Sequence, residues 1–252
     1  MNRLVRCWPG PLLAAAVLVV PPVAAAQEIV PAPTPAVGGG LTWWEGALAL
    51  GGIAALTALD PPVQRFAQDN RGSITNDLAS AARHFGQPEV YATASLGLVA
   101  AGLISGNRGL THAGVRVTSA VLTTGAVALG AKFVAGRGRP SEPGIDHDDF
   151  FPLSRHSSFP SGHTAMAFAL ATSLSQEIHN SWASVGLYTL ATGTALSRIN
   201  DNVHWFSDVA AGAALGIVSA KFATGRLRVF GIDAPSFIPR AGGMSVGWSG
   251  SF

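Results

Sequence analysis

Three short stretches in the second half of this chain hold residue types that suit the cleavage of a phosphate ester. They are residues 132–140 (KFVAGRGRP), 160–163 (PSGH) and 197–208 (SRINDNVHWFSD). Together they offer cations to hold phosphate oxygens, two imidazoles and a carboxylate. Phosphoryl transfer depends mainly on positioned positive charge and on an activated nucleophile. The combination therefore predicts one site that binds and cleaves phosphate.

His204 and Asp208 are four residues apart, a spacing that places two side chains on one face of a helix. A carboxylate beside an imidazole fixes its tautomer and stabilises its charged form, which leaves the other ring nitrogen as a nucleophile. Taken alone, such a pair is equally typical of a helix-stabilising contact. Arg198 lies six residues before His204, where it could reach the same cleft or simply cap a helix.

Two basic residues of the first stretch are candidates for holding phosphate. Lys132 lies in an apolar run, where a cation needs a partner or must extend to a membrane surface. Arg139 precedes Pro140, which restricts the local backbone, and its guanidinium can hold two phosphate oxygens. We expect the neighbouring Arg137 to face solvent.

The second stretch leads into an apolar helix. Ser161 is suited to cap that helix, and the free backbone N–H groups of a first helical turn form an anion site. Gly162 lets the backbone approach closely, and His163 would then lie beside the anion, placed to donate a proton to a leaving oxygen. A plain helix cap with a surface histidine is the alternative.

In order and spacing, the three stretches resemble the type 2 phosphatidic acid phosphatase superfamily, which includes bacterial acid phosphatases and vanadium haloperoxidases. The matching pattern is Lys, six residues, Arg-Pro; then Pro-Ser-Gly-His; then Ser-Arg, five residues, His, three residues, Asp. The resemblance implies that His204 forms a phosphohistidine, His163 is the general acid and Asp208 orients His204. It implies no metal or cofactor, and a phosphate cage of Lys132, Arg139, Ser161, Gly162 and Arg198.

Six apolar segments must position these residues, near 42–59, 90–105, 112–135, 163–178, 182–198 and 204–222. They are too long for strands and lack strict alternation, so they predict helices. The expected fold is an all-α six-helix bundle of the same superfamily, embedded in a membrane. Stretches such as 90–106 carry no charge, although they are slightly short of the ~20 residues that span a bilayer. A tight soluble bundle is the alternative.

The segments between and around these helices are more polar. Residues 60–89 contain Asp60-Pro61-Pro62, which we expect to stop a helix, and a second break at 86–88. Residues 136–162 predict a long loop. Its acidic cluster at 146–149, with His156, matches no metal-binding spacing and is expected to be solvated.

The N-terminal residues have the pattern of a segment that is cleaved during export. Residues 1–26 have the pattern of a signal peptide, or of an uncleaved anchor, and 27–40 form a Pro/Gly linker. A helical phosphatase domain over 41–225 and a tail over 226–252 follow. Cleavage would remove Cys7, the only cysteine, and would leave 14 basic against 14 acidic residues, because Arg3 and Arg6 go with the leader. A neutral chain argues against a nucleic-acid partner.

The charge distribution and the predicted signal peptide disagree about the side of the membrane on which the N-terminus lies. Basic residues after the last helix favour a cytoplasmic C-terminus. If all six segments span the membrane, the N-terminus is then cytoplasmic as well. A cleaved signal peptide would instead leave the N-terminus outside. We expect an exported protein, either in the bacterial inner membrane with its site facing the periplasm or in the soluble periplasm.

The expected activity is metal-independent hydrolysis of phosphate mono- or diphosphate esters, most readily of lipid phosphates. A soluble periplasmic non-specific acid phosphatase is the main alternative. A vanadium haloperoxidase and a non-catalytic lipid-phosphate-binding protein are further ones.

Overall fold

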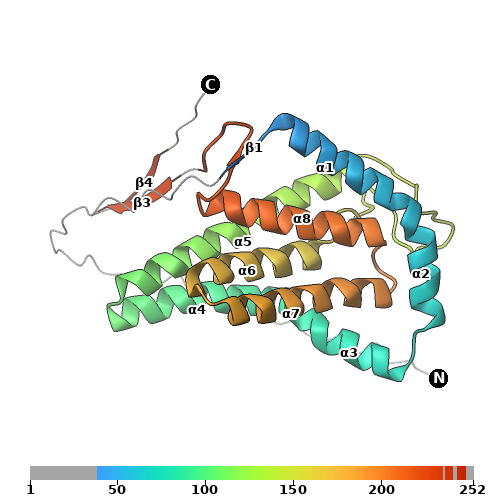
Figure 1. Ribbon diagram of the computed structural model, residues 1–252, viewed down its shortest axis with the longest axis horizontal. Helices are drawn as coiled ribbons and strands as arrows, with labels where there is room; N and C mark the ends of the chain where they lie inside the picture. Colours follow the sequence, from blue (N-terminus) through green and yellow to red (C-terminus); the bar gives the residue numbers. More distant parts are fainter. Residues whose placement is uncertain (1–38, 235, 241–242, 248–252) are drawn as a thin grey trace, which may run out of the picture.

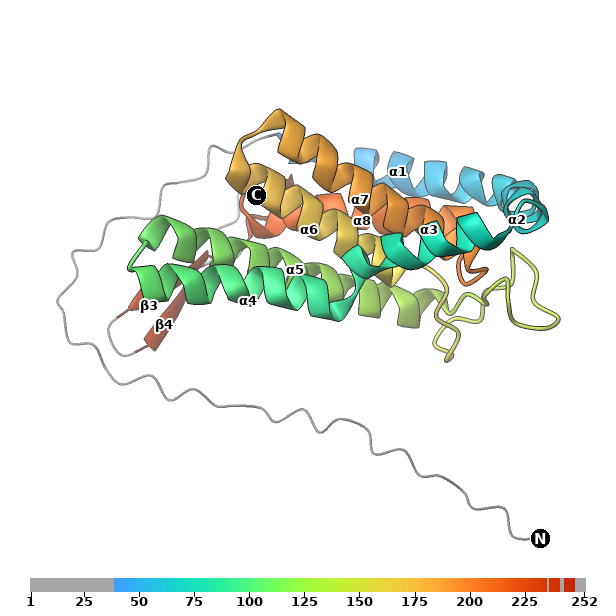
Figure 2. The same cartoon turned by 90° about the horizontal axis from the view of Figure 1, so that it is seen from below.

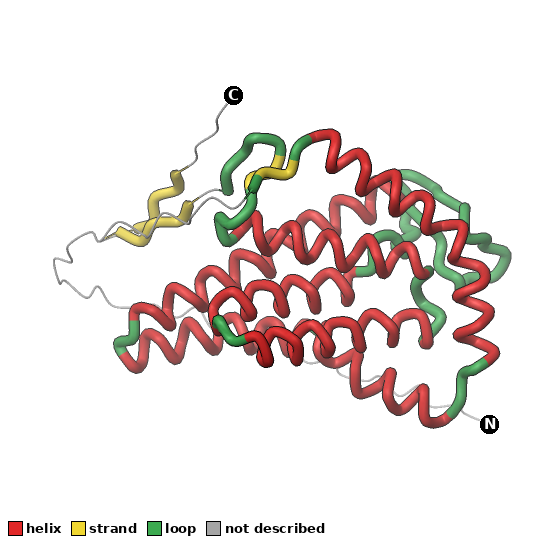
Figure 3. Tube along the Cα trace, viewed as in Figure 1, coloured by secondary structure: helices red, strands yellow, loops and turns green. Residues whose placement is uncertain are grey.

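The computed structural model describes residues 39–234, 236–240 and 243–247, and in them the fold is helical (Figures 1 and 3). All six predicted helices are present: α1 (Trp43–Leu56), α4 (Pro88–Ser105), α5 (Arg108–Ala135), α6 (Gly162–Ile178), α7 (Ser181–Asn200) and α8 (Phe206–Ala223). The predicted signal peptide, Cys7 and most of the linker lie outside the described residues.

The polar segment 60–89 is also helical. The predicted stop at Asp60-Pro61-Pro62 is instead the start of α2 (Asp60–Asp69), with the prolines in its first turn. A first turn has no intrahelical acceptor for those backbone N–H groups, so proline is tolerated there. Helix α3 (Ser73–Arg83) follows, and the predicted break at 86–88 is a short 3₁₀ turn before α4. Helix α2 runs across one end of the bundle (Figure 1).

Helix α6 is the centre of the bundle and packs against α5, α7 and α8 (Figures 1 and 2). Its buried residues are mostly small, as are those it contacts, so the helices approach closely. Gly216 of α8 shows how closely: a Cβ atom there would lie 2.3 Å from the carbonyl oxygen of Ala165. The small residues therefore hold the site-bearing helix ends in a fixed arrangement.

Four short strands complete the described chain. Strand β1 (Gly40–Leu41) pairs in parallel with β2 (Arg228–Val229), and β3 (Ser236–Arg240) pairs antiparallel with β4 (Gly243–Gly247). The β1–β2 pair joins the start of the domain to the segment after α8.

Four helical stretches are long and apolar enough to cross a membrane: Trp43–Asp69, Ser73–Ser105, Arg108–Ala135 and Phe206–Ala223. Large apolar side chains on these helices are exposed, among them Leu48 at 67%, Ile104 at 87% and Leu122 at 67%. A soluble protein seldom exposes so much apolar surface, whereas lipid solvates it. The chain is therefore a membrane protein, and the soluble alternative is disfavoured.

The helix ends that carry the three motifs lie at the same end of the bundle. Helix α5 ends there, α6 begins, α7 ends and α8 begins, and the loop over 136–161 lies beside them (Figure 2). Residues separated in the sequence are thereby brought within contact distance.

Candidate active site

Contacts between the motifs show that they converge. The backbone N–H of Ser161 donates to the carbonyl oxygen of Asp208 over 2.9 Å. A Cβ atom on Gly162 would lie 3.5 Å from Cε of Lys132. The ring of His163 lies near four other predicted site residues, whose positive charges lower its pKa: Arg198, His204, Lys132 and Arg139. The structure thus brings together every residue that the sequence predicted for the site.

His204 and Asp208 meet, but not on one helical face as predicted. His204 lies in the turn before α8, whose N-cap is Trp205. Its Nδ1 atom is 3.5 Å from Oδ2 of Asp208, which is long for a hydrogen bond. His204 is 4% exposed and Asp208 is fully buried. Nε2, the ring nitrogen further from Asp208, is left for a substrate.

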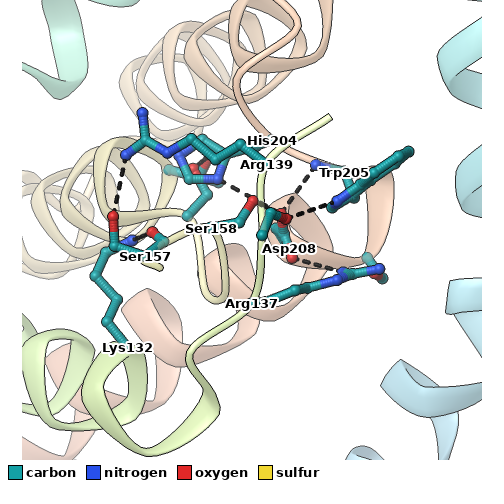
Figure 4. A network of polar contacts seen from close by, with 12 residues as sticks. Lys132, Arg137, Arg139, Ser157, Ser158, His204, Trp205 and Asp208 are labelled. Atoms are coloured by element: carbon teal, nitrogen blue, oxygen red, sulfur yellow. Dashed lines mark hydrogen bonds and ion pairs between the residues drawn. The ribbon is translucent and has the colours of Figure 1, made fainter. Parts of the chain in front are cut away.

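Asp208 is held by three donors (Figure 4). Its Oδ2 atom accepts from Oγ of Ser158 over 2.5 Å and from the backbone N–H of Trp205 over 2.9 Å. Its Oδ1 atom accepts from Nη1 of Arg137 over 2.6 Å. The carboxylate is therefore fixed in orientation beside His204.

The prediction that Arg137 faces solvent is wrong, because its side chain is fully buried. Its guanidinium donates to Asp208, to Asp60 over 2.6 Å and to Oγ of Ser207 over 2.7 Å. Its Nε donates to the carbonyl oxygen of His147 over 3.0 Å. Four partners replace water, which is how a buried cation is tolerated.

Asp60 is a member of this buried network that the sequence did not indicate. It begins α2, is fully buried and accepts from Arg137 and from Ser207. A charge beside a proline pair at the end of an apolar helix was the available signal, but such a pattern equally marks a helix start. Its partner lies 77 residues away in the sequence, so spacing could not reveal the pair.

The predicted phosphate-holding cations have hydrogen-bonding capacity to spare. Nζ of Lys132 donates to the carbonyl oxygen of Ser157 over 2.5 Å. Nη2 of Arg139 donates to the side-chain Oγ of Ser157 over 3.3 Å. Nη2 of Arg198 donates to Asp201 over 2.5 Å. A lysine has three donors and an arginine five, so most N–H groups make no bond to another described residue and can bind an anion.

The turn into α6 has the predicted geometry with one difference. Ser161 is the N-cap residue, but its side chain makes no capping bond. It is fully buried and accepts from Oγ1 of Thr164 over 3.0 Å, so its own hydroxyl hydrogen is available to a ligand. The N–H groups of the first turn, including those of Gly162 and His163, add to this anion-binding geometry.

Burial sets the charge of both imidazoles. It lowers the pKa of His163, which lies outside the four candidate spans, to about 4, and the charges of Arg198 and His204 act in the same direction. Burial also lowers the pKa of His204, against the opposing effect of Asp208. Both rings are therefore neutral near pH 7, as a nucleophile must be.

Several of the remaining histidines and acidic residues make local bonds. Nδ1 of His156 lies 2.7 Å from Oε2 of Glu142, and the N–H of Asp146 donates to Asp149. Nδ1 of His84 lies 2.7 Å from the carbonyl oxygen of Ser80. Over the described ranges, no group of three His, Cys, Asp or Glu residues has a metal-binding arrangement.

Comparison with known families agrees with this arrangement. The model of the PAP2 superfamily matches residues 113–228, which include all the predicted site residues. This part of the helical domain, 116 of the 252 residues, matches the PAP2 superfamily. The resemblance of its three motifs is thereby confirmed, as is the helical fold that the resemblance implied.

Individual proteins that are similar to this chain include a phosphatase named for lipid A. Over 63 residues the chain is 54% identical to the lipid A 1-phosphatase of Porphyromonas gingivalis, a match that covers 24% of this chain but only 14% of that protein. LpxE of Aquifex aeolicus shares the fold with a TM-score of 0.52 and 24% identity, over 66% of this chain and 94% of that one.

A second solved structure gives the same result. The transmembrane PAP2-type phosphatidylglycerolphosphate phosphatase of Bacillus subtilis has a TM-score of 0.55 and 21% identity, over 71% of this chain and 92% of that one. At such identities these two structures establish the fold.

Proposed function

We propose that this protein is a metal-independent phosphatase that hydrolyses lipid phosphate mono- or diphosphate esters through a phosphohistidine on His204. The observation that carries the proposal is the meeting of two neutral imidazoles and three cations at one end of a membrane bundle. A fixed carboxylate lies behind one of the imidazoles.

Substrate binding uses the spare donors. Lys132, Arg139 and Arg198 hold the non-bridging phosphate oxygens, together with the hydroxyl of Ser161 and the first N–H groups of α6. These donors are in place before substrate arrives, so little reorganisation is needed as charge redistributes in the transition state.

In the first chemical step, Nε2 of His204 attacks phosphorus and the bond to the leaving oxygen breaks. Positive charge develops on the ring and is stabilised by Asp208, 3.5 Å from Nδ1. His163 acts in its protonated form, which is the minor form near pH 7 because its pKa is lowered to about 4. It gives that proton to the leaving oxygen, which departs as an alcohol or as a phosphate.

In the second step, water attacks the phosphohistidine. His163, now neutral, removes a proton from that water, and the bond between phosphorus and Nε2 breaks. Inorganic phosphate leaves and both imidazoles return to their initial state, so the cycle consumes only water.

A lipid substrate is favoured by where the site lies. The apolar faces of α1, α4 and α5 place the bundle in a bilayer, so the site at its end is within reach of lipid headgroups. The relatives named for lipid A and for phosphatidylglycerolphosphate support the same class. We include a site on the outer, periplasmic side in this proposal because residues 1–26 have the pattern of an export signal.

A substrate panel tests this proposal. Detergent-purified protein is given lipid phosphates, lipid diphosphates and water-soluble monoesters, and released phosphate is counted with EDTA present. We expect the highest kcat/KM on a lipid substrate and no loss in EDTA. A metal requirement, or no preference for lipids over soluble esters, would contradict the proposal.

A further inference from the structure

Asp60 is a buried carboxylate that reaches the site from outside the three motifs. We propose that Asp60 is a positioning residue for phosphoryl transfer. Through Arg137 and Ser207, it holds Asp208 beside His204 and keeps the negative charge of Asp208 available to that ring. This inference rests on the function proposed above.

The first link runs through one guanidinium. Nη2 of Arg137 donates to Oδ2 of Asp60 and Nη1 donates to Oδ1 of Asp208, each over 2.6 Å. All three side chains have no exposed surface. A guanidinium is planar and rigid, so holding one nitrogen on Asp60 fixes the direction in which the other points toward Asp208.

The second link runs through the backbone of α8. The N–H of Ser207 donates to Oδ1 of Asp60 over 2.7 Å, and its hydroxyl donates to Oδ2 over 2.6 Å. That hydroxyl also accepts from Nη1 of Arg137. Ser207 directly precedes Asp208, so Asp60 fixes the helical turn from which Asp208 projects.

The net charge of this cluster affects how well His204 can become positively charged during the reaction. Two carboxylates and one guanidinium leave one net negative charge in the buried cluster. Without Asp60, Arg137 would neutralise Asp208, and His204 would develop positive charge beside a neutral pair. Electrostatic interactions are strong where water is excluded, so this difference bears on the attacking step.

A purely structural role is the competing explanation, because α2 is also hydrogen-bonded to the end of α7 and to the turn that leads from α7 to His204. Nε2 of Gln64 donates to Asn202 over 2.8 Å, and Nε2 of Gln68 donates to the carbonyl oxygen of Ile199 over 3.1 Å. On that explanation Asp60 would only hold α2 on the bundle. The two explanations differ in whether the effect of Asp60 depends on Asp208.

A double-mutant cycle separates them. Asp60→Asn, Asp208→Asn and the double variant are compared with wild type for kcat, KM and Tm on the best substrate. We expect Asp60→Asn to lower kcat about 10- to 100-fold, as outer partners of ligating histidines do elsewhere, with KM little changed. In the Asp208→Asn background the same change should have almost no further effect. Asp69→Asn, an exposed acid on the same helix, is the matched control and should keep the wild-type kcat.

Two outcomes of the cycle would overturn the inference. A wild-type kcat in Asp60→Asn is one, and losses that multiply in the double variant are another, because Asp60 would then act independently of Asp208. If Asp60→Asn does not fold, Ser207→Ala decides, since it removes the bridging hydroxyl and keeps both carboxylates. A lowered kcat at unchanged Tm supports the inference, and an unchanged kcat refutes it. Wild-type protein that releases no phosphate would overturn the proposed function, and this inference with it.

Discussion

At the scale of single residues, the two imidazoles of the site differ in their surroundings. His204 has a carboxylate beside Nδ1, whereas the charged groups near His163 are cations, together with His204. One ring is therefore supported as it gains charge, and the other gives up a proton readily. This division matches the roles of nucleophile and general acid.

The acid role of His163 predicts how activity depends on pH. Its pKa of about 4 means that the protonated fraction rises as the pH is lowered from 8 toward 5. The pKa of His204 is also lowered by burial, which favours the neutral, nucleophilic form of that ring as the pH falls. We expect kcat/KM for an alkyl phosphate, whose leaving group needs a proton, to rise as the pH falls.

The control for this prediction is His163→Asn measured on two substrates. The variant should lose the rise with the alkyl phosphate and retain most activity on an aryl phosphate, whose leaving group departs without a proton. The pH dependence on the aryl phosphate also shows how much of the change in rate comes from ionisation of the substrate's own phosphate group. An alkyl-phosphate rate that increases toward pH 8 would contradict the acid role.

At the scale of helices, the site depends on how closely α8 approaches the start of α6. Gly212 of α8 lies against Ser161, and a Cβ atom there would be 2.6 Å from the Ser161 carbonyl oxygen. Backbone cannot give way as a flexible side chain can, so any side chain at 212 must separate the two helices. The same two helices carry His163 and Asp208.

Gly212→Ala should therefore lower both stability and activity. We expect a loss of about 1–3 kcal/mol in the free energy of unfolding, typical of overpacking, together with a reduced kcat. Gly186→Ala is the matched control, because position 186 is exposed on α7 and a Cβ atom there would have no other atom within 4 Å. Unfolding in denaturant and phosphate release are measured on both. Equal stability of the two variants would show that the approach of α8 to α6 is not limiting.

At the scale of the whole molecule, most of the bundle and its motif residues could be predicted from the sequence. Apolar segments without alternation indicate helices, and motifs at their ends indicate one shared end of a bundle. His204 differs only locally, because the turn before α8 brings it to Asp208 without a shared helical face.

The buried network behind the site could not be predicted. Arg137 is one of three arginine or lysine residues in its motif, and nothing in local composition separates a buried guanidinium from an exposed one. Asp60 becomes a partner only after α2 crosses the end of the bundle, a contact 77 residues long in sequence. Such contacts follow from the tertiary arrangement and leave no spacing to detect.

Trapping the covalent intermediate is the most direct test of the central claim. Wild-type protein is mixed with substrate labelled with ³²P at the phosphoryl group and quenched in alkaline denaturant, and the labelled peptide is identified by mass spectrometry. We predict label on His204, and loss of both label and phosphate release in His204→Ala. Label on another residue, or full turnover by His204→Ala, would contradict the account.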